Sequence, residues 1–154
     1  MIKRSLIFSF LLLNSLNLFS QVGNSVLSSG KWAKFYVDTT GVFKIDKSLL
    51  QQIGVSTANL DPRTIKIYGN SGGMLPEKNS DFRHDDLPEN SIFISGEDDG
   101  VFNDNDYILF YSKGPDTWNV DVQNNTASHI KNVYSDKTYY FITSGGSNGK
   151  RISS

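Results

Sequence analysis

The chain has 154 residues, of which 38% are hydrophobic and 12% aromatic; this suits one folded domain and excludes disorder over most of its length. A formal net charge of −1 leaves no basic field that would attract nucleic acid, so no nucleic-acid partner is expected. The absence of cysteine excludes disulfides, thiolate metal sites and a cysteine nucleophile within these residues.

Residues 1–20 are predicted to be a secretory signal peptide. MIKR gives a cationic start, and residues 5–19 form an apolar run that is short for a membrane span. Cleavage is expected after Ser20, which leaves residues 21–154 as a β-rich domain exported from the cytoplasm. A transmembrane anchor is the alternative interpretation of the same run.

Short runs of β-branched and aromatic residues separated by glycine and asparagine predict an all-β fold, either an antiparallel β-sandwich or a barrel-like domain. KWAKFYV (31–37) and VFKI (42–45) flank a DTTG turn and predict a hairpin. Alternation in the first run places Ala33, Phe35 and Val37 on one face.

One short helix is expected near 47–53. Asp46 can cap its start, because the carboxylate accepts a backbone N–H of the first turn. Gly54 supplies a left-handed stop. The apolar face of this helix would carry Leu49, Leu50 and Ile53.

Polar loops are expected at 69–90 and 113–130, the second with a weak strand near 118–122. Further strands are expected at 64–69, 91–95, 107–112 and 133–143, the last as one long strand or a strand pair. The runs at 91–95 and 107–112 are continuously apolar, which predicts burial on both faces. Residues 144–154 carry no helix or cap signal, so the domain is expected to be cut short at its C-terminal end.

GEDDGVFNDNDY (96–107) separates these two apolar runs. Asp-Gly favours a turn, so we interpret the stretch as an acidic connection with Phe102 folded back onto the core. The alternative is a calcium loop with EF-hand spacing. Its oxygen ligands would be Glu97, Asp99, Asn103 and Asp106. Ser95 at the first ligand position and strands on both sides argue against it, so no metal or cofactor is assigned.

No catalytic residue can be singled out. His84 stands beside Asp85 and Asp86, but the chain has no G-x-S-x-G elbow to supply a nucleophile, so a solvated loop histidine is the preferred interpretation. His129 is isolated, and two distant histidines make a weak zinc case.

Two tryptophans leave a second class of function open. Trp32 and Trp118 are predicted to be core or half-buried strand residues, but exposed aromatic rings could stack on sugars. A secreted carbohydrate-binding or calcium-binding β-sandwich module is therefore an alternative function. A small secreted hydrolase that uses loop carboxylates is a third.

Several phrases in order, SVLSSGKWAKFYVDTTGVFKID, LDPRTIKIYGNSGGMLPE, DDLPENSIFISGEDDGVFNDNDYILFYSKGPDTW and NVYSDKTYYFIT, resemble the N-terminal region of the PorU-like sortases. These belong to the type IX secretion system and are relatives of the gingipain-type cysteine peptidases. The resemblance runs from about Ser25 to about Ile152 and lacks the peptidase domain. It carries over no catalytic residue, because the histidine and cysteine of such enzymes lie further along the chain.

The resemblance implies a non-catalytic domain of a cell-surface endopeptidase and transpeptidase, which removes a C-terminal sorting signal from exported cargo and attaches the cargo to lipopolysaccharide. The implied partners are the downstream peptidase domain of the same parent, an outer-membrane β-barrel of the PorV type, and exported cargo through the parent. The implied location is the cell surface or outer membrane.

Overall fold

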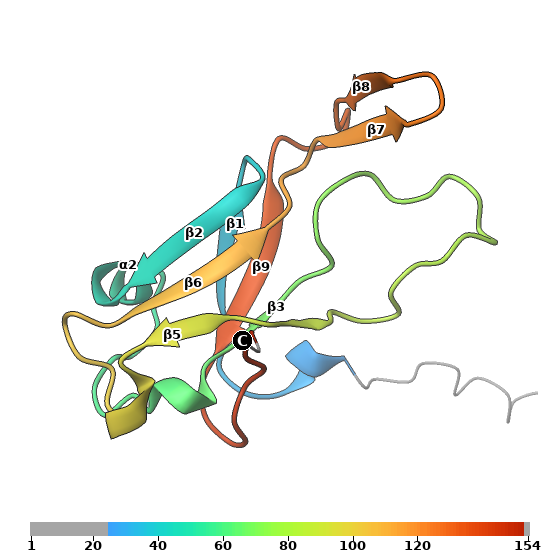
Figure 1. Cartoon of the computed structure of the whole chain (residues 1–154). Coiled ribbons are helices and arrows are strands. Elements are labelled where there is room, and N and C mark those ends of the chain that lie inside the picture. Colours follow the sequence, from blue (N-terminus) through green and yellow to red (C-terminus); the bar gives the residue numbers. More distant parts are fainter. Residues whose placement is uncertain (1–24, 153–154) are drawn as a thin grey trace, which may run out of the picture.

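A computed structural model describes residues 25–152, so the signal-peptide prediction lies outside the described residues. Two antiparallel sheets face each other as a sandwich (Figure 1), which confirms the all-β, sandwich-like prediction. One sheet has the order β1 (Ala33–Val37), β9 (Thr138–Thr143), β3 (Lys66–Tyr68) and β4 (Glu89–Asn90). The other has the order β2 (Gly41–Asp46), β6 (Tyr107–Ser112) and β5 (Phe93–Ser95). A separate hairpin pairs β7 (Thr117–Asp121) with β8 (Thr126–Ile130).

The predicted hairpin at 31–45 is wrong, although both of its strands exist. β1 pairs with β9 and β2 pairs with β6, so the two consecutive strands lie in different sheets. The turn between them crosses from one layer of the sandwich to the other. The inward face is as predicted, because Ala33 and Val37 are buried and Phe35 packs against the core.

The apolar runs at 91–95 and 107–112 form β5 and β6, but they are not buried on both faces as predicted. Burial alternates along β6: Ile108 and Phe110 are 0% exposed, whereas Tyr111 is 53% exposed. In β5, Phe93 is likewise 45% exposed. In a two-layer sandwich each sheet keeps one face toward solvent, because no third layer covers it.

Three aromatic rings from both sheets form the centre of the core. Phe110 of β6 packs edge-to-face on Tyr140 of β9, with ring centroids 4.7 Å apart, and on Phe35 of β1 at 5.9 Å. Phe35 also stacks on Tyr140. Offset and edge-on contacts of this kind are favoured by the quadrupoles of the rings, so the cluster fixes how the layers face each other.

The predicted helix is confirmed as α2 (Lys47–Gln52). Asp46 caps it, since its Oδ1 accepts from the backbone N of Leu49 at 2.9 Å. Leu50 is fully buried under the sandwich, and Gly54 ends the helix with a φ of +90°. In the part of the chain that the structure describes, three short 3₁₀ turns accompany it: η2 (Val26–Ser28), η3 (Pro62–Thr64) and η4 (Glu97–Asp99). No helix within residues 25–152 is long and apolar enough to cross a membrane.

The last third of the chain differs from the prediction in two places. The weak strand near 118–122 is β7, but its partner β8 lies in what was predicted to be polar loop. The run at 133–143 gives one strand, β9, which begins only at Thr138. β8 lacks a periodic apolar signal because all five of its residues are exposed.

Candidate functional site

The acidic stretch at 96–107 connects β5 to β6 and folds onto the body. Phe102 is 1% exposed, and its backbone N donates to the carbonyl oxygen of Leu60 at 2.9 Å. This confirms that Phe102 turns back into the core. Asp104 reaches Lys47 of α2 at 2.6 Å, and this hydrogen bond lowers the pKa of the carboxyl.

The four predicted calcium ligands all have protein partners. Glu97 binds Arg151 at 2.7 Å. Asp99 accepts from the Asn103 side chain at 2.8 Å, and Asp106 accepts from the Asn103 backbone N at 2.6 Å. Within residues 25–152, no three His, Cys, Asp or Glu side chains are grouped so that they could hold a metal ion. Calcium binding remains the alternative interpretation of this stretch, and a calorimetric calcium titration of the chain tests it.

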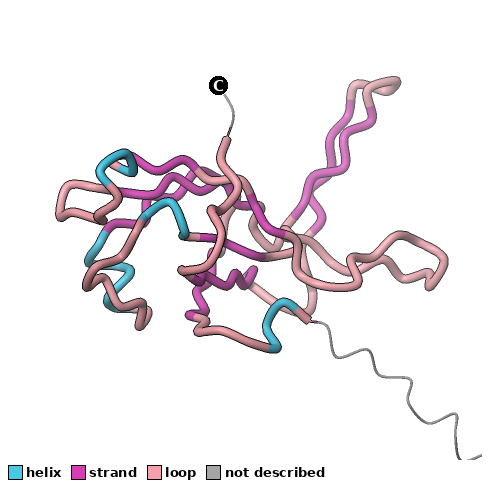
Figure 2. Tube along the Cα trace, turned by 90° about the horizontal axis from the view of Figure 1, so that it is seen from below, coloured by secondary structure: helices cyan, strands magenta, loops and turns pink. Residues whose placement is uncertain are grey.

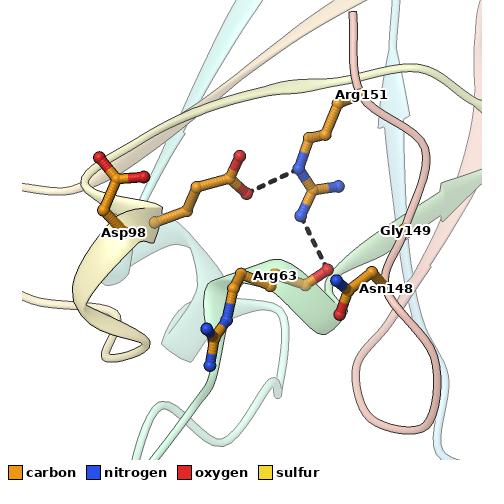
Figure 3. A pocket seen from close by; sticks show the side chains of 6 residues that line it. Arg63, Asp98, Asn148, Gly149 and Arg151 are labelled. Atoms are coloured by element: carbon orange, nitrogen blue, oxygen red, sulfur yellow. Dashed lines mark hydrogen bonds and ion pairs between the residues drawn. The ribbon is translucent and has the colours of Figure 1, made fainter.

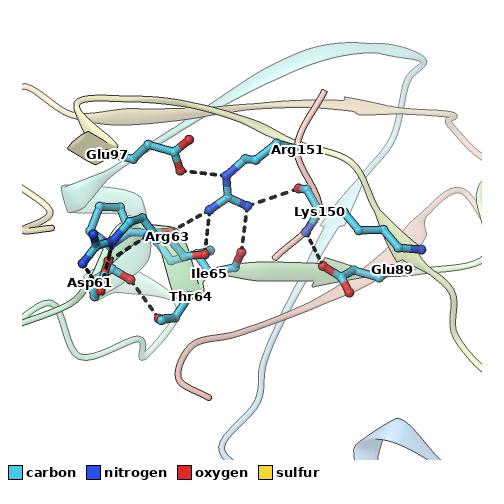
Figure 4. A network of polar contacts seen from close by, with 9 residues as sticks. Asp61, Arg63, Thr64, Ile65, Glu89, Glu97, Lys150 and Arg151 are labelled. Atoms are coloured by element: carbon cyan, nitrogen blue, oxygen red, sulfur yellow. Dashed lines mark hydrogen bonds and ion pairs between the residues drawn. The ribbon is translucent and has the colours of Figure 1, made fainter. Parts of the chain in front are cut away.

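Arg151 joins three parts of the chain through its guanidinium group (Figures 3 and 4). Its Nε donates to Glu97 Oε2, and the two side chains are only 22% and 28% exposed. Its terminal nitrogens donate, at 2.9–3.3 Å, to the backbone carbonyl oxygens of Pro62, Arg63, Ile65 and Lys150. No periodic pattern in the sequence predicts this network, because its members lie far apart along the chain.

The same network holds residues 149–152 against the sandwich. Ile92 donates to the carbonyl of Lys150 at 3.3 Å, and Ile152 donates to the carbonyl of Ile92 at 3.0 Å, as in a parallel ladder. A depression of about 310 Å³ beside Arg151 is also lined by Arg63 (Figure 3). Both guanidinium groups already have carboxylate partners, because Arg63 binds Asp61 at 2.8 Å. This depression therefore has a structural role.

Among the described residues 25–152, no hydrogen bond or ion pair joins His84 of the RHDD motif to Asp85 or Asp86. His84 is exposed in the 69–90 loop and packs edge-on against Phe82, with ring centroids 5.0 Å apart. Asp86 turns away to the start of the described chain, where it accepts from Ser25 Oγ and from the backbone N of Val26. The second histidine, His129, lies on β8.

Two segments project from the sandwich on the same side: the β7–β8 hairpin and the loop between β3 and β4 (Figures 1 and 2). Both carry large apolar side chains in solvent. The exposed fraction is 67% for Trp118, which was predicted to be core or half-buried, and 78% for Phe82. Trp32, by contrast, is half-buried as predicted and packs edge-on against Tyr68.

A groove of about 580 Å³ lies between the loop and the segment that follows the hairpin. We call it the apolar groove; its lining is Gly73, Met74, Leu75, Pro76, Glu77, Asn132, Val133 and Tyr134. Leu75 is 72% exposed, Val133 75% and Tyr134 86%. Contiguous exposed apolar side chains of this kind are typical of interaction surfaces.

One wall of the apolar groove is held by hydrogen bonds to Asn132. The Oδ1 of Asn132 accepts from the backbone N of Tyr134 at 2.9 Å and of Ser135 at 3.2 Å. Its own backbone N donates to Asp116, just before β7. The turn that presents Val133 and Tyr134 is therefore built by the chain itself.

Comparison with known proteins is informative at the level of solved structures. No protein-family model matches the chain, and no curated protein sequence matches it significantly. Among solved structures, the crystal structure of dimeric latent PorU from Porphyromonas gingivalis matches with a TM-score of 0.66 and 32% sequence identity. The chain contains a PorU-like domain. The match covers 84% of the chain, in agreement with the resemblance seen in the sequence.

The same match covers only 11% of the PorU chain. The activity and partners of the whole protein therefore come to this chain only as a proposal. The comparison shows that the sandwich resembles a part of the PorU chain.

Proposed function

We propose that this chain is a non-catalytic docking domain of a PorU-like sortase of the type IX secretion system, acting at the cell surface in the secretion and attachment of exported proteins. The likeness to PorU supports the proposal that the parent protein is a PorU-like sortase. Exposed apolar side chains around the apolar groove support docking. With no cysteine in its 154 residues, the chain supplies no thiolate nucleophile of its own.

The proposed occupant of the apolar groove is the peptidase-bearing part of the parent. Leu75, Val133 and Tyr134 together present apolar surface that is costly to leave in water. A rigid turn already presents two of them, so little conformational entropy is lost when a partner covers the groove. A PorV-type barrel is a second proposed partner of the assembled protein.

Photo-crosslinking in the cells that produce the chain tests this proposal. A benzoyl-phenylalanine replaces Tyr134 in the groove, and the same residue replaces Tyr111 on the outer face of β6 as a matched exposed control. We expect an adduct that contains the peptidase-domain sequence from position 134 and none from position 111. Equal adducts from both positions, or none from position 134, would overturn docking through the groove.

The genomic sequence provides a separate test of the parent. Codons for a peptidase domain with a histidine and a cysteine are expected downstream of codon 154. If neither that sequence nor a separate PorU-like peptidase gene is present in the genome, the assignment to a sortase fails.

A further inference from the structure

The β7–β8 hairpin has two faces with different surroundings. Trp118 and His129 are directly opposite each other in the register, so their side chains share a face, with ring centroids 5.0 Å apart. Thr117 points to the other face and meets Gly73 of the apolar groove, its Cγ2 3.0 Å from where a Cβ of that glycine would lie. The Trp118 face is therefore separate from the groove.

A pocket of about 370 Å³ lies on the Trp118 face, between the hairpin and the turn that joins β1 to β2. We call it the Trp118 pocket; its lining is Asp38, Thr39, Thr40, Gly114, Asp116, Trp118 and His129. A volume of this size lies within the range of small-molecule sites, roughly 300–1,000 Å³. The lining combines one large aromatic ring with carboxylate, hydroxyl and imidazole groups.

Several of these polar groups are held in place. Asp116 Oδ1 accepts from the backbone N of Asn132 at 2.9 Å, and its Oδ2 lies 3.4 Å from Nε2 of His129. Thr40 Oγ1 accepts from the backbone N of Gly114 at 2.9 Å, which ties the β1–β2 turn to the base of the hairpin. The pocket is thus pre-organised from two parts of the chain that are distant in sequence.

The chemistry of the lining selects a class of ligand. Trp118 offers a broad apolar ring that is 67% exposed, which suits the C–H face of a sugar. Sugar hydroxyls both donate and accept, and the pocket supplies both functions: carboxylates accept, whereas the Thr39 hydroxyl and the His129 imidazole can do either. The same ring and carboxylates also suit a cationic group, so a lysine-rich peptide is included as a competitor in the test below. Asp38 and Asp116 disfavour anionic ligands by charge repulsion.

We propose that the Trp118 pocket binds a saccharide, neutral or amino-bearing rather than anionic, with Trp118 as the stacking platform and Asp38 and Asp116 as acceptors for sugar hydroxyls. This proposal does not depend on the docking function, because the two pockets share no lining residue.

A glycan-binding experiment on the whole chain tests the proposal. The probes are immobilised neutral hexose oligosaccharides, glucosamine-containing oligosaccharides and sulfated polysaccharides, with a lysine-rich peptide as the cationic competitor. We expect binding to a neutral or amino-bearing class, and quenching of tryptophan fluorescence when the same oligosaccharide is added in solution.

Two variants locate the site. Trp118→Ala is expected to weaken binding at least tenfold and to abolish the quenching, while Asp116→Asn weakens binding and keeps the acceptor for Asn132. Tyr111→Ala, on the outer face of β6 and outside both pockets, is the control and is expected to bind normally. Circular dichroism confirms folding of each variant. Binding to none of the sugars, binding to sulfated polysaccharides or the peptide alone, or binding that survives Trp118→Ala would overturn the proposal.

Discussion

Replacing Arg151 with alanine is expected to destabilise the domain strongly, although the residue lies outside the apolar core. Its guanidinium makes one charge-assisted hydrogen bond to Glu97 and four hydrogen bonds to backbone carbonyl groups. A hydrogen bond to a charged group contributes about 1.5–3 kcal/mol, and a buried partner left alone costs more. Water can replace part of these hydrogen bonds once the side chain is removed. We therefore expect the free energy of unfolding to fall by about 3 kcal/mol rather than by the sum of the five separate bond energies.

Urea denaturation followed by circular dichroism measures this loss. Arg151→Lys should cost about 2 kcal/mol, because a single ammonium cannot reach the carboxylate and the separated carbonyl groups together. Glu97→Gln keeps an acceptor for the Nε of Arg151 and should cost about 1 kcal/mol. Lys150→Ala, which removes an adjacent exposed charge, is the control and should stay within about 0.5 kcal/mol. A loss below about 0.5 kcal/mol for Arg151→Ala would refute the reasoning.

Phe110→Ala should lower the free energy of unfolding by about 3–5 kcal/mol, whereas Tyr111→Ala, one residue away on the solvent face, should cost less than about 1 kcal/mol; equal losses would contradict the alternation seen in β6. Gly69→Ala should lower the urea concentration at the unfolding midpoint, because the added Cβ would overlap a core ring. Gly41→Ala has open space around the added Cβ and should leave the midpoint unchanged, so equal midpoints for the two variants would contradict this reasoning. Backbone N–H donors lower the folded-state pKa of Asp86. Its contribution to the free energy of unfolding is therefore fully present above the ordinary pKa of 3.8 and is lost as the pH falls through the lowered pKa. Asp86→Asn should therefore flatten the acid limb of a stability-against-pH curve, and an unchanged limb would count against that assignment.

The sequence predicts local structure well where the signal is local. The cap at Asp46, the helix face and the stop at Gly54 are all set by residues between positions 46 and 54, and all three are confirmed. Alternation likewise identified the inward face of β1. The sandwich follows from short alternating strands, because each sheet can bury only one face.

Pairing between strands was harder to predict, because it depends on distant residues. β1 and β2 are joined by a short turn that suits a hairpin. In the structure, however, β1 pairs with β9 and β2 pairs with β6, and both partners lie much later in the chain. Arg151 could not be recognised either, since its carbonyl partners carry no side-chain signature. The exposed Trp118 was misplaced because the sequence does not show that β7 and β8 stand away from the core.

The position of β9 in the middle of its sheet sets an order of events in folding. β9 pairs on one side with β1 and on the other with β3, and the first of these pairings joins Ala33 to Ile142. That sheet cannot close until the last strand has been synthesised, so the closing step carries the entropy cost of a very long loop. Such sequence-distant contacts typically give folding times of milliseconds to seconds, and we expect this chain to fold in that range. Until β9 is available, β1 and β3 therefore lack the strand that lies between them in the sheet.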